Sequence, residues 1–221
     1  RVPPGAGRNV RMELEAARAA LTAFVGEVTQ GSAALHRRDT PGVDPSALRR
    51  WEEAHAPHRL PGDLRALYEE SNGLDWSWAA TRTGAPVGRL TVNSLDKLRK
   101  EDMDPAQVSQ ATGYPQHGDG PAAFSLDDAV EDGRAFLVFT GDGSEPSVWF
   151  QDLSLNWYLV APSFMDYLRL MVMHLGIVHW QYAFTAVGLD PVSSALLATY
   201  APGRLDVDTQ LREAGEIPQL A

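Results

Sequence analysis

The fold is decided by the stretch Leu60-Pro61-Gly62-Asp63-Leu64-Arg65-Ala66-Leu67-Tyr68-Glu69-Glu70-Ser71-Asn72-Gly73. Its first four residues are typical of a helix start. Apolar side chains then recur at Leu64, Leu67 and Tyr68, at a spacing that fits a helix. Asn72-Gly73 can adopt the left-handed backbone conformation in which helices end. The stretch therefore predicts a short helix that ends at Asn72-Gly73.

Two more helices are predicted on the N-terminal side of this stretch. Asp44 can cap a helix and Pro45 is favourable at its first position, with Leu48 and Trp51 facing inward. Further upstream, apolar residues at steps of three and four predict an amphipathic N-terminal helix: Val10, Leu14, Ala17, Leu21, Phe24 and Val28. We expect a loose leader over 1–8 and a polar linker over 31–43.

After Gly73 the apolar spacing changes from helical to alternating. Trp76 and Trp78 flank Ser77 and predict a strand, and we expect a returning strand over 87–92. A short helix and a mobile loop are expected within 95–120. Further strands are expected at about 122–126, 134–140, 146–151 and 156–160, with a hairpin turn at 141–143. Because the strands cluster between groups of helices, the predicted fold class is α+β.

The last third of the chain predicts helices again. Residues 162–175 are apolar on most sides, which is typical of a buried helix. A short helix is expected over 179–187, and Asp190-Pro191 predicts the start of another that reaches Tyr200. Residues 201–221 show no strong period. We therefore expect three parts: an N-terminal leader, helix and linker (1–43), an α+β domain (44–202) and a C-terminal tail or arm (203–221).

Composition limits the classes of partner. The formal net charge is −10, so the surface repels nucleic acid, anionic lipid and acidic protein tails. No apolar run has the length of a membrane span. The chain contains no cysteine, which excludes disulfides and thiolate metal sites and fits a reducing compartment. We expect neither nucleic acid nor a membrane among the partners.

The motifs that could carry chemistry have simpler structural interpretations. His55 and His58 have a metal-binding spacing, but Pro57 interrupts the helix between them. His174 and His179 are better explained by a helix terminus or a core hydrogen bond. The turn at 141–143 lacks the Lys-Ser/Thr ending of a phosphate-binding loop. We therefore expect no catalytic, cofactor-binding or metal-binding residues, and no cofactor.

The aromatic residues are the most unusual feature of the sequence, which contains six tryptophans. Core packing is the simplest explanation for each of them. Trp76 and Trp78 share one face of a predicted strand, however, and an uncovered face would anchor a partner. The candidate partner-binding residues are Trp76, Trp78, Trp149, Trp157, Trp180 and Tyr182.

Two groups of residues carry a resemblance to known families. Residues 60–73 resemble the signature of the SUKH superfamily: a Leu-Pro-x-Asp helix start, an aromatic residue and Asn-Gly. A second set resembles the subunit 2 family of tubulin polyglutamylase complexes: Trp76-Ser77-Trp78, Trp149–Asp152, Asn156–Tyr158, Phe164–Leu170, His174–Gly176 and Trp180–Thr185. The resemblance covers about residues 44–202, in the same order.

The resemblance implies a SUKH-like domain with an antiparallel or mixed sheet flanked by helices. It implies a non-catalytic adaptor or scaffold subunit of such a complex, or of a related ciliary or axonemal microtubule assembly. In the polyglutamylase complex, a separate tubulin-tyrosine-ligase-like subunit would ligate glutamate. Such complexes act on tubulin tails at centrioles, cilia, axonemes and neuronal microtubules. Contact with microtubules would then be indirect, in the cytoplasm and cytoskeleton.

Two other classes of function stay open at this point. SUKH domains also occur as immunity proteins that neutralise toxins, and an acidic surface would suit a basic nuclease toxin. An enzyme is the third alternative. A cleft with converging polar groups of shifted pKa would be its first support.

Overall fold

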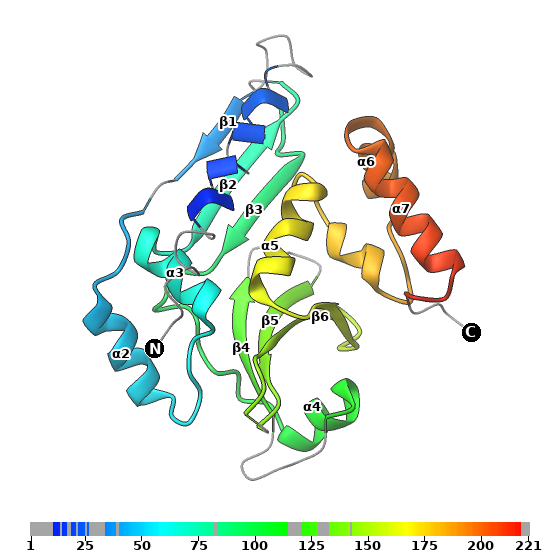
Figure 1. The fold of residues 1–221 in the computed structure, drawn as a ribbon. Coiled ribbons are helices and arrows are strands. Elements are labelled where there is room, and N and C mark those ends of the chain that lie inside the picture. Colours follow the sequence, from blue (N-terminus) through cyan, green and yellow to red (C-terminus); the bar gives the residue numbers. More distant parts are fainter. Residues whose placement is uncertain are drawn as a thin grey trace. The chain divides into compact units, whose positions relative to one another are not determined.

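The structure is a computed structural model that describes residues 11–13, 15–16, 19–20, 22–24, 26, 34–38, 40–81, 84–114, 121–127, 133–141 and 143–217 (Figure 1). The described residues form two compact units. The first unit draws on the ranges 1–15, 39–74 and 91–167, and the second on 16–38, 75–90 and 168–221. The chain therefore passes between the units more than once. The predicted domain limits at residues 44 and 202 stay predictions.

Two helices of the first unit, α2 (Pro45–Ala54) and α3 (Gly62–Glu70), begin at the predicted signals. In α2, the Asp44 side chain accepts a hydrogen bond of 2.7 Å from the Ser46 backbone amide, and Leu48 and Trp51 are buried. The decisive stretch forms α3, which ends slightly before the predicted Asn72-Gly73. The third helix of this unit is α4 (Pro105–Thr112), within the segment where a short helix was predicted.

Asp63, an acidic residue of the decisive stretch, connects the starts of two helices. Its Oδ1 atom accepts a hydrogen bond from the Leu64 amide at 2.8 Å, and its Oδ2 atom accepts one from the Met165 amide at 2.8 Å. Met165 lies in the first turn of α5 (Phe164–Met173). One carboxylate therefore satisfies amides of two helix starts that have no partner within their own helices.

The sheet of the first unit is an antiparallel meander in the order β4-β5-β6-β7. Its strands fall where four strands were predicted: β4 (Ala122–Asp127), β5 (Gly133–Phe139), β6 (Ser147–Asp152) and β7 (Trp157–Ala161). The outer edge of β4 is covered, because Ser125 donates to Arg99 and Glu101 donates to Ala123, each at 3.0 Å. The opposite edge of the sheet is β7.

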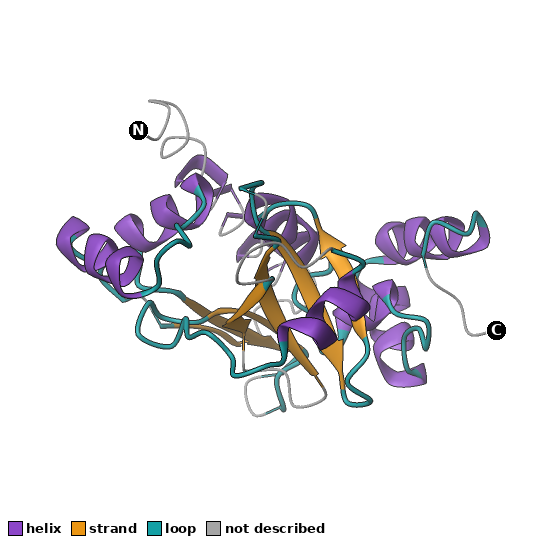
Figure 2. Ribbon diagram, turned by 90° about the horizontal axis from the view of Figure 1, so that it is seen from below, coloured by secondary structure: helices purple, strands orange, loops and turns teal. Residues whose placement is uncertain are grey.

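The second unit contains the other sheet and the C-terminal helices. The predicted strands are β2 (Leu74–Ala79) and β3 (Gly88–Val92), in the order β1-β2-β3. The predicted short helix is the 3-10 helix η1 (Trp180–Phe184), and α6 (Pro191–Tyr200) begins at Asp190-Pro191 as expected. Figure 2, with helices and strands in different colours, shows the mixture of both that the predicted α+β class requires.

Two secondary-structure predictions are wrong in this unit. The expected linker contains β1 (Ala34–Arg37), which pairs antiparallel with β2. The expected tail contains α7 (Pro202–Glu213), which lies beside α6 in Figure 1. The described residues between 11 and 26 are helical, but positions between them lie outside the described part of the chain, so a continuous N-terminal helix stays a prediction. Among the described residues, no helix has the length and apolar character needed to cross a membrane.

Candidate partner-binding surfaces

Four of the six aromatic residues predicted to bind partners are buried within the chain. Trp76, Trp78, Trp149 and Trp180 are each less than 10% exposed. Trp157 and Tyr182 are half-buried. The burial favours core packing for the first four, which is the simpler of the two explanations. Partner binding stays a prediction. Of the six residues, Trp157 and Tyr182 are the most accessible to a partner.

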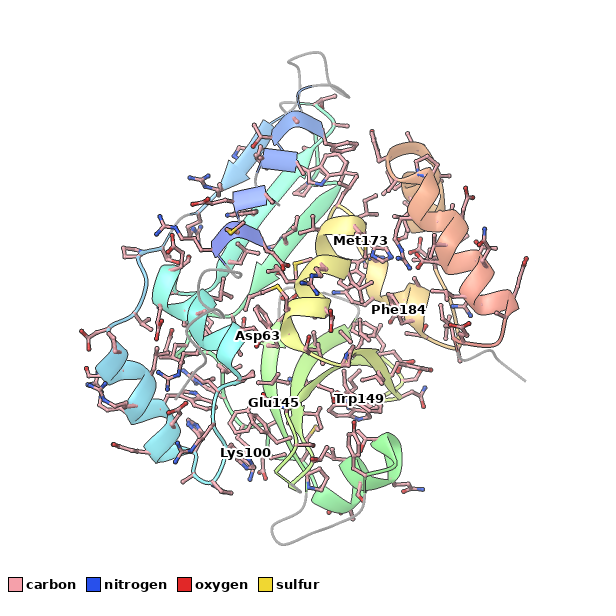
Figure 3. All side chains as sticks on the ribbon, in the orientation of Figure 1. Asp63, Lys100, Glu145, Trp149, Met173 and Phe184 are labelled. Atoms are coloured by element: carbon pink, nitrogen blue, oxygen red, sulfur yellow. The ribbon has the colours of Figure 1, made fainter. Side chains whose placement is uncertain are left out.

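Trp149 and Trp157 pack in the core of the first unit. Together with Phe136 they lie on the face of the sheet that α4 covers, in a cluster that also contains Val108, Ala123 and Val138. The rings of Phe136 and Trp157 are 4.9 Å apart. Figure 3 labels Trp149 near α4. Trp157 therefore contributes one side to this core and keeps part of its indole accessible.

Trp180 packs against a buried histidine in the second unit. Its ring stacks on the imidazole of His174 at 4.7 Å. The Nδ1 atom of His174 is 2.7 Å from the Leu170 carbonyl, and its Nε2 atom is 2.9 Å from the Asp208 carboxylate. Both ring nitrogens of His174 therefore lie within hydrogen-bonding distance of an oxygen acceptor. Asp208 also accepts a hydrogen bond from Arg204. The contact between His174 and Asp208 is the core hydrogen bond that was one of the expected roles of His174.

A Ser-His-Asp group occurs at the start of α6, but its geometry is that of a helix cap. Asp190 accepts hydrogen bonds from the backbone amides of Val192 and Ser193 at 2.8 and 3.0 Å. The Ser193 hydroxyl is buried and donates to Asp190, and His179 Nδ1 also lies 3.2 Å from that carboxylate. A nucleophilic serine would instead donate to the histidine.

Hydrogen bonding and burial set the pKa of Asp190. Burial alone would raise this pKa, but the hydrogen bonds from Ser193, His179 and Val192 outweigh it and lower the pKa to about 2. The carboxylate is thus ionised at neutral pH and caps α6. The group contributes to the structure of the helix start, and the Ser193 hydroxyl oxygen also lies 3.5 Å from His179 Nδ1.

A groove of about 1000 Å³ lies in the first unit, lined by the segment between α2 and α3 and by the turn after β5. Its charged lining is balanced: Arg49, Arg59, Arg65, Glu52, Glu69 and Glu145. Arg65 Nη2 lies 2.7 Å from Glu52 Oε1, so part of this charge is neutralised within the groove. Among the described residues that line the groove, basic and acidic side chains are therefore equal in number.

The two histidines with metal-binding spacing both pack against aromatic rings, and each lies 5.4 Å from the ring of Phe124. His55 Nδ1 is 2.8 Å from the Trp51 carbonyl oxygen, and its ring stacks on the indole of Trp51. The ring of His58 lies 4.9 Å from that of Phe139. In the part of the chain that the structure describes, no three acidic or histidine side chains form a group that could hold a metal ion.

The structure shows another candidate surface, which the sequence analysis did not identify. Three leucines of the β6–β7 hairpin are exposed: Leu153 (68%), Leu155 (70%) and Leu159 (49%). Together with half-buried Trp157 they form what we call the hairpin surface. The alternation of Leu153, Ser154 and Leu155 was the available signal, but alternation alone does not distinguish a buried face from an exposed one.

Comparisons with known proteins place these surfaces in context. The family model described as SMI1 / KNR4 family (SUKH-1) matches residues 42–170. Proteins named tubulin polyglutamylase complex subunit 2 from Mus musculus and Rattus norvegicus are each 26% identical to the chain over 168 residues, covering 65% of this chain and 57% of the relative. The Homo sapiens protein of that name is 25% identical over 188 residues, covering 74% of this chain and 62% of the relative. The chain thus spans about three fifths of the length of these relatives. The groove and the hairpin surface both lie within the matched residues.

Proposed function

The chain belongs to the SMI1/KNR4 (SUKH-1) family, and from that membership we propose that it is a non-catalytic adaptor subunit of a tubulin polyglutamylase complex. The observation that carries the proposal is the similarity to proteins named as subunit 2 of that complex. Among the residues that carry the sequence resemblance, four tryptophans are buried in the cores of the described units: Trp76, Trp78, Trp149 and Trp180. The similar residues therefore preserve a fold that can present binding surfaces.

The proposed partners are the other subunits of the complex, including a tubulin-tyrosine-ligase-like subunit that would ligate glutamate. Two observations support an adaptor role. The Ser193-Asp190-His179 group caps a helix, and the charges of the groove balance one another. With a net charge of −10, the chain repels acidic tubulin tails, so contact with microtubules would run through other subunits.

This role would place the protein in the cytoplasm, on the cytoskeleton, at cilia, axonemes or the centriolar region. The location follows from the proposed complex. Imaging of the tagged full chain in ciliated cells, with and without depolymerised microtubules, would measure it.

Affinity purification tests membership of the complex. The tagged full chain is expressed in ciliated cells, and the purified material is analysed for the tyrosine-ligase-like subunit. We expect that subunit to co-purify and the purified complex to add glutamate to microtubules. The chain alone, supplied with ATP, glutamate and microtubules, is expected to add none. Purification without any complex subunit would overturn the proposal, and glutamate ligation by the chain alone would overturn its non-catalytic part.

The family membership and the acidic charge also favour a second candidate, a SUKH-type immunity protein that binds a toxin. The two candidates differ in partner. A gene for a basic nuclease toxin beside the gene for this chain, and inhibition of that nuclease by the purified chain, would favour immunity. Co-purification with the ligase-like subunit would favour the adaptor.

A further inference from the structure

The hairpin surface concentrates exposed apolar side chains on a short segment. Leu153, Leu155 and Leu159 lie within one hairpin, and all three are among the most exposed large apolar residues that the structure describes. Single exposed leucines are common on protein surfaces and need no explanation. Three on one hairpin, together with a half-buried tryptophan, concentrate apolar surface on one segment, and concentrated exposed apolar surface marks interaction sites.

The hairpin surface also lacks the charges that normally protect such a segment. No charged residue occurs from Leu153 to Ala161, although 22% of the chain is charged. This run includes β7, the end strand of its sheet. Exposed end strands usually carry charges, prolines or bulges that prevent unwanted pairing. The pairing has one irregularity, at Val148/Trp149, and because Trp149 pairs with Leu159 it lies beside that leucine and leaves Leu153 and Leu155 without such protection.

Leu155 occupies a backbone conformation that disfavours leucine. Its φ angle is +64°, in the left-handed region. Glycine and asparagine adopt this region at lower cost. The residue therefore raises the free energy of the folded state and exposes an apolar side chain to water. Folding of the isolated chain explains neither property.

We propose that the hairpin surface docks into an uncharged apolar surface of another subunit of the complex, an inference that rests on the proposed function. The neutrality of the hairpin identifies the chemistry of the partner, because a charged partner surface would lose hydration without gaining an ion pair. A second copy of this chain fits less well. Two copies would bring together net charges of −10 each, which disfavours self-association.

Matched variants of the full chain test the docking. The first is the triple variant Leu153→Ser, Leu155→Asn and Leu159→Thr. The control replaces three exposed valines of the second unit: Val187→Thr, Val192→Thr and Val207→Thr. We expect the hairpin triple variant to recover about tenfold less ligase-like subunit on purification, since apolar anchors carry most of the binding energy of an interface. The control is expected to recover as much as the unmodified chain.

A single substitution tests the docking even if the triple variant does not fold. Ser154→Lys changes an exposed residue at the hairpin tip and places a charge within the neutral surface. Its circular dichroism spectrum is expected to match that of the unmodified chain, while recovery of the complex falls. A photo-reactive benzophenone amino acid at position 154 is expected to crosslink to another subunit.

The outcomes separate the docking surface from the proposed function. Equal recovery by Ser154→Lys, the hairpin triple variant and the control overturns the docking surface alone, provided that the unmodified chain recovers the complex. A crosslink to a second copy, seen at twice the chain's mass, also overturns the stated occupant. Failure of the unmodified chain to recover any subunit overturns the proposed function, and the docking surface with it.

Discussion

The indole Nε1 of Trp78 donates a hydrogen bond of 2.7 Å to the carbonyl oxygen of Leu175. Trp78 is fully buried, and the rings of Phe24 and Tyr200 meet it edge-on at 5.4 and 5.2 Å. Gly88 lies against this hydrogen bond, because a Cβ atom at position 88 would be 2.2 Å from Nε1 and 2.5 Å from the Leu175 oxygen. The core of the second unit therefore requires glycine at this position.

The substitution Gly88→Ala is expected to lower the free energy of unfolding by about 3 kcal/mol, because overpacking and a broken buried hydrogen bond both contribute. Urea unfolding followed by tryptophan fluorescence measures this change. Gly203→Ala is the control: a Cβ atom there meets nothing within 4 Å, and alanine favours the α7 helix. Similar stabilities for the two variants would contradict the proposed packing around Trp78.

Local signals predicted the elements whose boundaries depend on nearby residues. The Asp44-Pro45 and Asp190-Pro191 pairs start helices because the carboxylate and the proline act within one turn. The alternation around Trp76 predicted β2 because it, too, is a pattern of neighbouring residues. The sequence could not show that Trp76 and Trp78 are buried, because alternation reveals that side chains share a face but not what covers that face.

The missed elements depend on contacts between distant residues. The strand β1 contains only Ala34–Arg37, without alternation, and pairs with β2 residues such as Ala79. The helix α7 carries an aspartate, Asp208, at its buried position. A buried acid looks like a surface residue in sequence, and its partner His174 lies far away in the chain. The exposure of Leu155 was missed because its left-handed φ has no signal in the side-chain pattern.

Asp208→Ala is expected to lower the free energy of unfolding by about 3 kcal/mol, because it leaves Arg204 without its counter-charge and the buried His174 ring without its hydrogen-bond partner. Asp206→Ala, on the exposed side of the same helix, is expected to change it by less than about 0.5 kcal/mol. Chemical unfolding at pH 7 compares the two. Equal effects would contradict the buried network.

The same network predicts a dependence of stability on pH. Burial raises the pKa of Asp208, but the hydrogen bonds from His174 and Arg204 outweigh it and hold this pKa below its usual value of 3.8. The carboxylate therefore contributes stability that is fully present above the unfolded pKa and is lost as the pH falls through the folded pKa. We expect the unmodified chain to lose stability as the pH is lowered below 3.8. The denaturant concentration at the midpoint of chemical unfolding should then decrease. Asp208→Asn should remove part of this fall.

The cap at the start of α6 gives a smaller effect with its own pH range. Asp190→Ala is expected to cost about 1 kcal/mol, whereas Asp190→Asn, which also caps helices well, should cost much less. The lowered pKa of Asp190, about 2, means that the charged cap loses its contribution as the pH falls from 3.8 towards 2. Thermal unfolding of the three proteins between pH 7 and pH 2 measures both. Asp190→Asn should show a smaller acid-induced loss than the unmodified chain.

Leu155 allows folding and binding to be separated. Leu155→Asn is expected to raise the free energy of unfolding by about 1 kcal/mol, because asparagine tolerates the left-handed conformation and the replaced side chain is 70% exposed. Leu153→Asn is the control, since Leu153 is similarly exposed but is not among the residues with positive φ. If the hairpin surface docks, both variants should recover less of the complex, although only Leu155→Asn is stabilised. A variant that gains stability while it loses binding indicates that the leucine serves the interface. If Leu155→Asn proved no more stable than Leu153→Asn, the leucine would carry no folding cost, and this part of the argument for docking would fail.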